Sequence, residues 1–166
     1  MSILFASDQC STCPNSWRPF NIDGKLQCLK YFGKQKYPVA ESICKVNGGK
    51  LPLPENFNEN RDMENAFRNI LPSEPWITLG LNDAKIEGEY LKESGKPVNY
   101  FNWAKGRPRG HKTGYHSWDY VSMNMKEGNL GFKSGTWSDY YTTWVGATIC
   151  QLSCVAGKYK YFNKSY

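Results

Sequence analysis

The stretch WITLGLND, residues 76–83, decides the fold class. It is a short apolar run, which is typical of a buried strand. Earlier in the chain, Pro38 and Gly48 bound an apolar segment that fits a short helix, because proline is favoured in a first helical turn and glycine just past the end. Later, ATICQL at residues 147–152 predicts another strand.

A second helix is predicted to begin near Asn56. Asn56 and Glu59 have capping-box spacing, and the helix would place its apolar residues on one face, namely Met63, Phe67 and Leu71. Residues 17–32 alternate loosely around Asp23-Gly24, which predicts a β-hairpin. From Gly106 to Gly135 the chain is rich in Gly, Lys, Ser and Asn, and we expect long loops there. Together these elements indicate an α+β domain.

The totals limit the class of protein. A chain of 166 residues fits one domain with short tails, and no apolar run approaches the ~20 residues of a membrane span. Six cysteines, an even number, favour disulfides and an oxidising, extracellular compartment. Paired ligands at Cys10/Cys13 and Cys150/Cys154 could imitate a zinc site, but Cys28 and Cys44 would then be spare.

The net charge of +6 is concentrated in two places. The loop at 104–116 and the tail at 155–166 carry seven lysines and arginines and no acid, and the rest of the chain carries 14 cations against 15 acids. The loop sequence NWAKGRPRGHK, residues 102–112, is therefore a candidate binding site for anions.

The ordered series of motifs resembles the long form of the C-type lectin-like domain. The pieces that match are Cys13-Pro-Asn-Ser-Trp17, Cys28-Leu-Lys-Tyr-Phe32, Tyr37-Pro-Val-Ala40 with Cys44, Thr78-Leu-Gly-Leu81, Asn102-Trp103, Trp137-Ser-Asp139 and Ile149-Cys150-Gln151. The resemblance implies an α+β fold of two helices and short antiparallel strands, stapled by disulfides. It also implies that the termini meet and that a long loop region projects from the opposite side.

The same resemblance implies the disulfides Cys13–Cys28 and Cys44–Cys150. Cys10 and Cys154 lie just outside these pairs, and we pair them by elimination. The family usually has a further disulfide across the long loop region, where Tyr120 and Thr142 stand here. We therefore expect that region to depend on the packing of aromatic side chains, namely Trp118, Tyr120, Tyr140 and Tyr141.

Sugar-binding members hold calcium through oxygen ligands, of which calcium needs six to eight. The resemblance places their Glu-Pro-Asn triplet at Arg107-Pro108-Arg109, their later Glu at Trp118 and their final Asn at Ser138, so that Asp139 alone is kept. A guanidinium group has no lone pair that could coordinate a metal ion. We therefore expect no calcium at this sugar site and no obligatory cofactor. A second family site for calcium matches Asp83, Glu87 and Asp119. These residues form an alternative metal site, or else Asp83 and Asp119 cap turns and Glu87 pairs with Arg107 or Arg109.

Three functional hypotheses follow. The first is calcium-independent binding of an anionic glycan or an acidic protein surface, through ligand-binding residues Lys105, Arg107, Arg109, Lys112, Trp118 and Asp139. In the alternative role, Arg107 and Arg109 pair with internal acids and replace the metal. The second hypothesis is a protein-interaction module, including a homodimer, that uses aromatic loops. The third is an atypical calcium lectin that uses Asp83, Glu87, Asp119 and Asp139.

Other readings are weaker. The tail KYKYFNKSY alternates cations and aromatics, a pattern that can bind nucleic acid, but disulfides argue against a nuclear role and we expect no nucleic-acid partner. His111 and His116 could form a metal pair or a pH-sensitive cluster, or be exposed loop residues. Since no catalytic motif is present, we expect no enzyme. We divide the chain into an expression-derived start or leader remnant at 1–9, the domain at 10–154 and the basic aromatic tail at 155–166.

Overall fold

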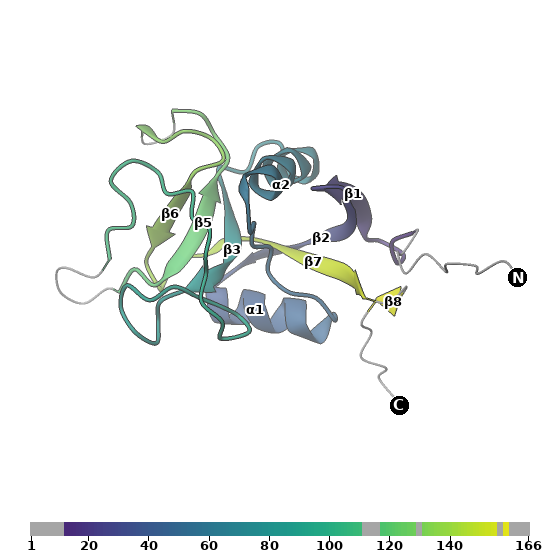
Figure 1. Cartoon of the computed structure of the whole chain (residues 1–166), viewed down its shortest axis with the longest axis horizontal. Helices are drawn as coiled ribbons and strands as arrows, with labels where there is room; N and C mark the ends of the chain where they lie inside the picture. The colour runs from purple at the N-terminus through teal and green to yellow at the C-terminus, as the bar shows by residue number, and fades with distance from the viewer. Residues whose placement is uncertain (1–11, 111–116, 129–130, 156–157, 160–166) are drawn as a thin grey trace, which may run out of the picture.

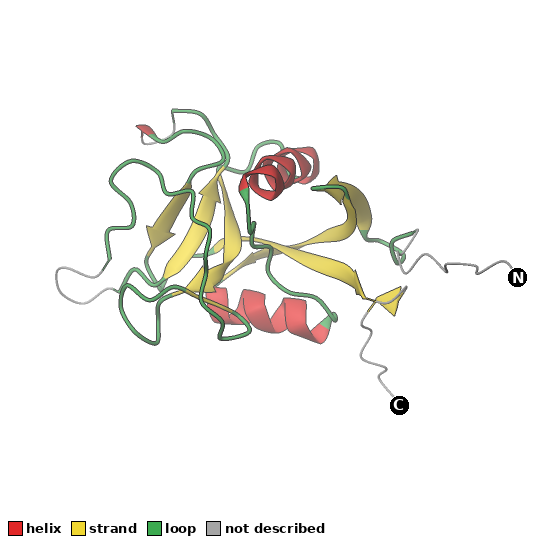
Figure 2. Ribbon diagram, in the orientation of Figure 1, coloured by secondary structure: helices red, strands yellow, loops and turns green. Residues whose placement is uncertain are grey.

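The computed structural model describes residues 12–110, 117–128, 131–155 and 158–159 (Figure 1). Two helices, α1 (Tyr37–Val46) and α2 (Phe57–Ile70), accompany one sheet in the order β1-β2-β7-β3-β5-β6, with β4 on β3 and β8 on β7 (Figure 2). The strands are β1 Arg18–Ile22, β2 Lys25–Gln35, β3 Trp76–Asn82, β4 Leu91–Lys92, β5 Tyr120–Asn124, β6 Trp137–Tyr140, β7 Gly146–Val155 and β8 Lys158–Tyr159. The predicted α+β class is confirmed.

The helices lie on opposite sides of the central β2–β7 ribbon (Figure 1). Strands β1 and β8 lie at one end of the molecule and the long loops around β5 and β6 lie at the other, as expected. The strand pairs are antiparallel with one exception, because β3 and β7 meet in parallel at Ile77 and Ala147. The expected short antiparallel strands are confirmed, and this one parallel pairing lies beside them.

Local chemistry explains the elements that were predicted. Asp23 and Gly24 both have positive φ, 48° and 77°, which is the backbone of a two-residue turn that matches the twist of a hairpin. Strand β1 consequently ends at Ile22 and β2 begins at Lys25, and these two residues pair. The Asn56 side chain caps α2 by accepting from the Glu59 N–H at 2.9 Å, as the sequence predicts.

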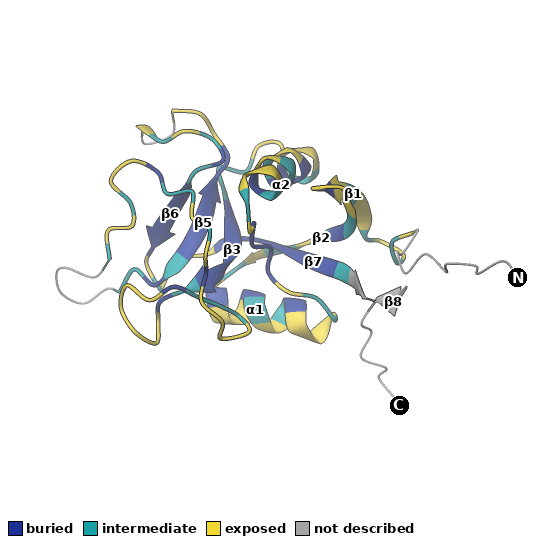
Figure 3. Ribbon diagram, viewed as in Figure 1, coloured by how far each residue is buried: buried dark blue, intermediate teal, exposed yellow. Residues whose placement is uncertain are grey.

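The core lies between α2 and the sheet, where Met63 and Phe67 pack against strand residues such as Ile77 and Val121. In Figure 3, β3, β5 and β6 are largely buried while the connecting loops are exposed. Strand β5 lies inside the segment 106–135 that was predicted to be loop, so that prediction is wrong there. Val121 and Met123 alternate inward on β5, a period-two signal that the polar composition around it obscures.

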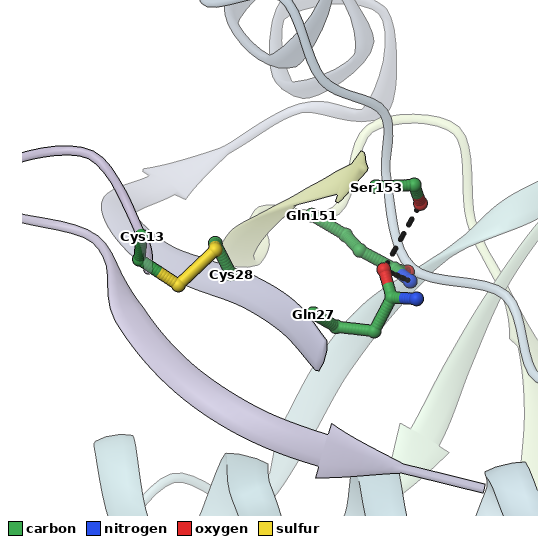
Figure 4. The surroundings of a disulfide bond; sticks show 5 residues. All are labelled: Cys13, Gln27, Cys28, Gln151 and Ser153. Atoms are coloured by element: carbon green, nitrogen blue, oxygen red, sulfur yellow. Dashed lines mark hydrogen bonds between the residues drawn. A yellow bond between two sulfur atoms is a disulfide. The ribbon is translucent and has the colours of Figure 1, made fainter. Parts of the chain in front are cut away.

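Two predicted disulfides are present. Cys13–Cys28 ties the amino-terminal segment to β2, next to Gln27, which accepts hydrogen bonds from Gln151 and Ser153 on β7 (Figure 4). Cys44–Cys150 joins α1 to β7 across a sequence separation of 106 residues. The expected Cys10–Cys154 bridge lies outside the described residues, because the placement of Cys10 is not described.

Candidate functional site

The Arg-Pro-Arg loop is fixed to β6 by its backbone. Ala104 donates to the Trp137 carbonyl at 2.8 Å, and Trp137 donates to the Asn102 carbonyl at 2.7 Å. The loop then turns, with a hydrogen bond from the Arg107 N–H to the Ala104 carbonyl at 3.0 Å and a cis peptide between Arg107 and Pro108. This path carries the Arg107 side chain toward the end of β6.

Arg107 and Asp139 form a buried ion pair. One guanidinium nitrogen of Arg107 donates to Asp139 Oδ1 at 2.9 Å and to the Asp139 carbonyl at 3.0 Å. The exposed fraction is 8% for the arginine side chain and 0% for the aspartate side chain. The sequence left two roles open for Arg107, namely contact with a ligand and pairing with an internal acid. The structure shows the pairing, because Arg107 is the cationic partner of Asp139, the one acid that the sugar-site pattern retains.

The second oxygen of Asp139 holds the loop backbone. Asp139 Oδ2 accepts from the Arg109 N–H at 2.7 Å and from the Gly110 N–H at 2.9 Å. Both carboxylate oxygens are thus used by donors of the loop. Asp139 acts as the anchor of the loop, and its role as a ligand-binding residue stays a prediction.

Aromatic rings surround the ion pair. The guanidinium of Arg107 lies 5.1 Å from the ring centroids of both Trp118 and Phe132, and that of Arg109 lies 5.4 Å from Trp118. Cation–π contacts of this kind are worth about 0.5–2 kcal/mol each. Two of the predicted anion-binding residues, Lys105 and Arg109, are exposed cations, and Trp118 lies partly buried beside Arg109. Lys112, His111 and His116 lie outside the described residues.

A pocket of about 190 Å³ opens beside this pair. Its lining residues, most of them aromatic, are Trp76, Arg107, Trp118, Ser122, Phe132, Ser138, Asp139, Tyr140, Tyr141 and Trp144. They come from β3, β5, β6 and the loops around them. Sequence reasoning singled out Arg107, Trp118, Asp139, Tyr140 and Tyr141. It missed Trp76, Phe132 and Trp144, because nothing in the sequence indicates that these distant segments converge.

The aromatic packing predicted in place of the missing disulfide is present. Tyr120 stacks on Tyr37 with ring centroids 4.2 Å apart and an interplanar angle of 3°, and Trp118 lies 4.0 Å from Tyr141. The Thr142 N–H donates to the Ser117 carbonyl at 3.2 Å. Burial raises the pKa of the Tyr140 hydroxyl, so this side chain stays neutral.

The second set of acids is that of the alternative metal site, Asp83, Glu87 and Asp119. Asp83 is buried, and its Oδ2 accepts from the Gly88 N–H at 2.8 Å, whereas Oδ1 has no hydrogen-bond partner in the described part of the chain. Burial raises the pKa of Asp83 to about 6, and the negative charges of Glu87 and Asp119 add to this rise. Within the described ranges, no three His, Cys, Asp or Glu side chains are arranged to hold a metal ion. The hydrogen bond from Gly88 shows that Asp83 caps the turn that ends there.

Comparisons with known proteins define the class. The family description "Lectin C-type domain" matches residues 33–152, and the chain belongs to this family of binding domains, which are not enzymes. The low affinity immunoglobulin epsilon Fc receptor of Mus musculus is 28% identical over 145 residues, which cover 86% of this chain but 38% of the receptor. The chain thus spans little more than a third of that relative's length.

Solved structures show the same fold. The mouse scavenger receptor C-type lectin carbohydrate-recognition domain aligns with a TM-score of 0.66 at 21% identity, covering 84% of this chain and 94% of that domain. A calcium-independent type II antifreeze protein aligns with a TM-score of 0.67 at 19% identity, covering 87% and 96%. At these identities the likeness establishes the fold alone. No helix in the described ranges is long and apolar enough to cross a membrane.

Proposed function

We propose that this domain binds an anionic glycan, or another polyanion, without calcium, through cations on the rim of the Arg-Pro-Arg loop. The observation that carries this proposal is the buried Arg107–Asp139 pair, which provides inside the protein the positive charge that a calcium ion would provide. It keeps the loop in shape without a metal. Arg109 and Lys105 then remain at the surface for a ligand.

The residues at the sugar-site position do not fit calcium. Calcium requires six to eight oxygen ligands, and the two arginines here are donors alone. Both oxygens of Asp139 already accept hydrogen bonds from Arg107, Arg109 and Gly110. The solved structure described as a calcium-independent antifreeze protein supports the view that this fold does not require the ion.

The cations on the rim of the loop are available to an anionic ligand. Lys105 and Arg109 are exposed, and no ion pair joins either side chain to a carboxylate among the described residues. A guanidinium offers two parallel donors to a sulfate or carboxylate, and the rigid loop loses little order on binding. Lys112, which follows in the sequence, extends this set in our proposal.

A heparin column tests the proposal. Lys105→Ala with Arg109→Ala should elute at clearly lower salt than the unchanged protein, because each cation that contacts the polyanion contributes to the salt dependence. The matched control is Lys25→Ala with Lys96→Ala, which removes the same charge from exposed positions elsewhere. Equal elution of the two double variants would refute the rim as the binding site.

Two other functions remain as alternatives. The side chains of Tyr141 and Val145, which are 41% and 43% exposed, favour a protein-interaction surface at the same end, including a homodimer. Light scattering across a concentration series would detect self-association.

For an atypical calcium lectin, the unpartnered Oδ1 of Asp83 is the supporting observation. That function requires a rise in melting temperature with calcium, which chelator reverses, and a flat response excludes it.

We also propose that the protein acts outside the cell. The Cys13–Cys28 and Cys44–Cys150 disulfides support this location, because such bonds persist in oxidising compartments. Detection of the mature chain in the culture medium of its own cells would test it, and retention in the cytosol would contradict it.

A further inference from the structure

The pocket beside the Arg107–Asp139 pair has the properties of a binding site in its own right. Its lining includes the mutually packed rings of Trp76, Tyr140 and Trp144, the packed pair of Trp118 and Tyr141, and Ser122 on β5. We propose that it binds one uncharged, flat aromatic ring of a small molecule. This inference does not depend on the proposed polyanion function, which uses the exposed cations of the rim.

The size of the pocket fits one ring. A cavity of about 150 Å³ lined by apolar side chains is known to bind benzene. The pocket here has about 190 Å³, enough for one or two fused rings. Tyr141, one of the lining residues, is 41% exposed, and its ring centroid lies 4.0 Å from that of Trp118.

The walls of the pocket are held in fixed orientations. Trp144 meets Trp76 edge-on at 5.7 Å and 80°, and meets Tyr140 at 4.4 Å and 65°. These crossing rings present both faces and edges, and an aromatic ligand can pack against them in the offset or edge-to-face arrangements that aromatic pairs prefer. Because the rings brace one another, little side-chain freedom is lost on binding.

The charge of the pocket favours a neutral ligand. Arg107 is the charged cation at the wall, and Asp139 neutralises it at 2.9 Å. The faces of Trp118 and Phe132 that could attract a cationic ligand already face the Arg107 guanidinium, 5.1 Å from each ring centroid. A cation would therefore find these ring faces occupied, and an anion would find a guanidinium that is already paired.

The polar groups of the pocket favour an aromatic ring over a sugar ring. The accessible lining is nearly all carbon, and the Ser138 hydroxyl already accepts from the Asn124 amide at 3.1 Å. A buried saccharide would leave several hydroxyls without partners, and each such group costs about 1–3 kcal/mol. An arene has no such groups to satisfy.

Ligand-observed NMR with three probes tests this assignment. Indole should give saturation transfer and bind at least about tenfold more tightly than benzenesulfonate or methyl glucopyranoside, a difference of about 1.4 kcal/mol. A folded protein that shows no transfer to indole would overturn the proposal. A preference for the sugar or the sulfonate would overturn the ligand class.

Variants locate the site. Ser122→Leu places a larger side chain in the lining of the pocket, and Phe132→Ala removes part of that lining, so both should weaken indole binding about tenfold or more. The control Phe57→Ala removes an aromatic ring that is 68% exposed at the start of α2 and should leave binding unchanged. If Phe132→Ala and folded Ser122→Leu bind indole as the unchanged protein does, the pocket is not the site. Phe132→Ala alone decides this if Ser122→Leu does not fold.

Discussion

Removing the carboxylate of Asp139 should cost this domain a large part of its stability. In Asp139→Ala the Arg107 guanidinium, 8% exposed, is left buried without a counter-charge. Breaking such a pair from one side costs about 3–5 kcal/mol. The Arg109 and Gly110 N–H groups also lose their acceptor. At about 2–4 °C per kcal/mol for a domain of this size, the melting temperature should fall by about 6–20 °C.

Two variants divide this effect. Asp139→Asn keeps one acceptor oxygen but loses the charge, so we expect about half the loss. Arg61→Ala is the control, since its ion pair with Asp62 involves a guanidinium that is 54% exposed and should contribute under about 1 kcal/mol. Unfolding should be followed in urea, because guanidinium ions from the denaturant compete with Arg107 for the Asp139 carboxylate of the unchanged protein. If Asp139→Ala and Arg61→Ala lose similar stability, the buried pair does not hold the loop.

Three further predictions concern the scaffold. Burial raises the pKa of Glu93 to about 7 from 4.5, so the folded chain holds this proton more tightly than the unfolded chain, and stability should fall as pH rises across that range. Glu93→Gln should flatten this slope in urea unfolding and stabilise the protein by about 1–3 kcal/mol at pH 8. Replacing both Cys44 and Cys150 by alanine should cost about 4–5 kcal/mol on the chain-entropy model, since the bridge closes a separation of 106 residues, and chemical denaturation measures this. Gly49→Ala would place a Cβ 2.6 Å from the Gln151 carbonyl oxygen, and calorimetry should show about 1–3 kcal/mol of destabilisation.

Features that depend on a few neighbouring residues were predictable from the sequence. The Asp23-Gly24 turn and the Asn56 cap follow from local backbone chemistry, and both are present. The Cys44–Cys150 pairing followed from resemblance to the family. Strand β5 was missed because its five residues lie within a polar segment, and its pairing partners on β3 and β6 are distant in sequence.

The candidate site was predictable in position but not in role. The sequence places two arginines in the loop, yet a guanidinium can face solvent or an internal acid, and residue spacing does not decide between them. The path of the backbone through the Ala104–Arg107 turn decides it, because this turn carries Arg107 to Asp139. The pocket requires side chains such as Trp76, Phe132 and Trp144 to converge from three separate segments.

The Arg107–Asp139 pair also explains why the two proposed binding modes can be separated. A buried carboxylate needs a positive partner, and a metal ion would leave open positions for ligand oxygens, whereas a guanidinium makes hydrogen bonds in its own plane and leaves its faces to aromatic rings. The Arg107 guanidinium therefore packs against the rings of Trp118 and Phe132, and this part of the pocket lining is aromatic. The uncompensated charge is left to Lys105 and Arg109 on the rim. Salt should accordingly weaken polyanion binding at the rim and leave ring binding in the neutral pocket nearly unchanged.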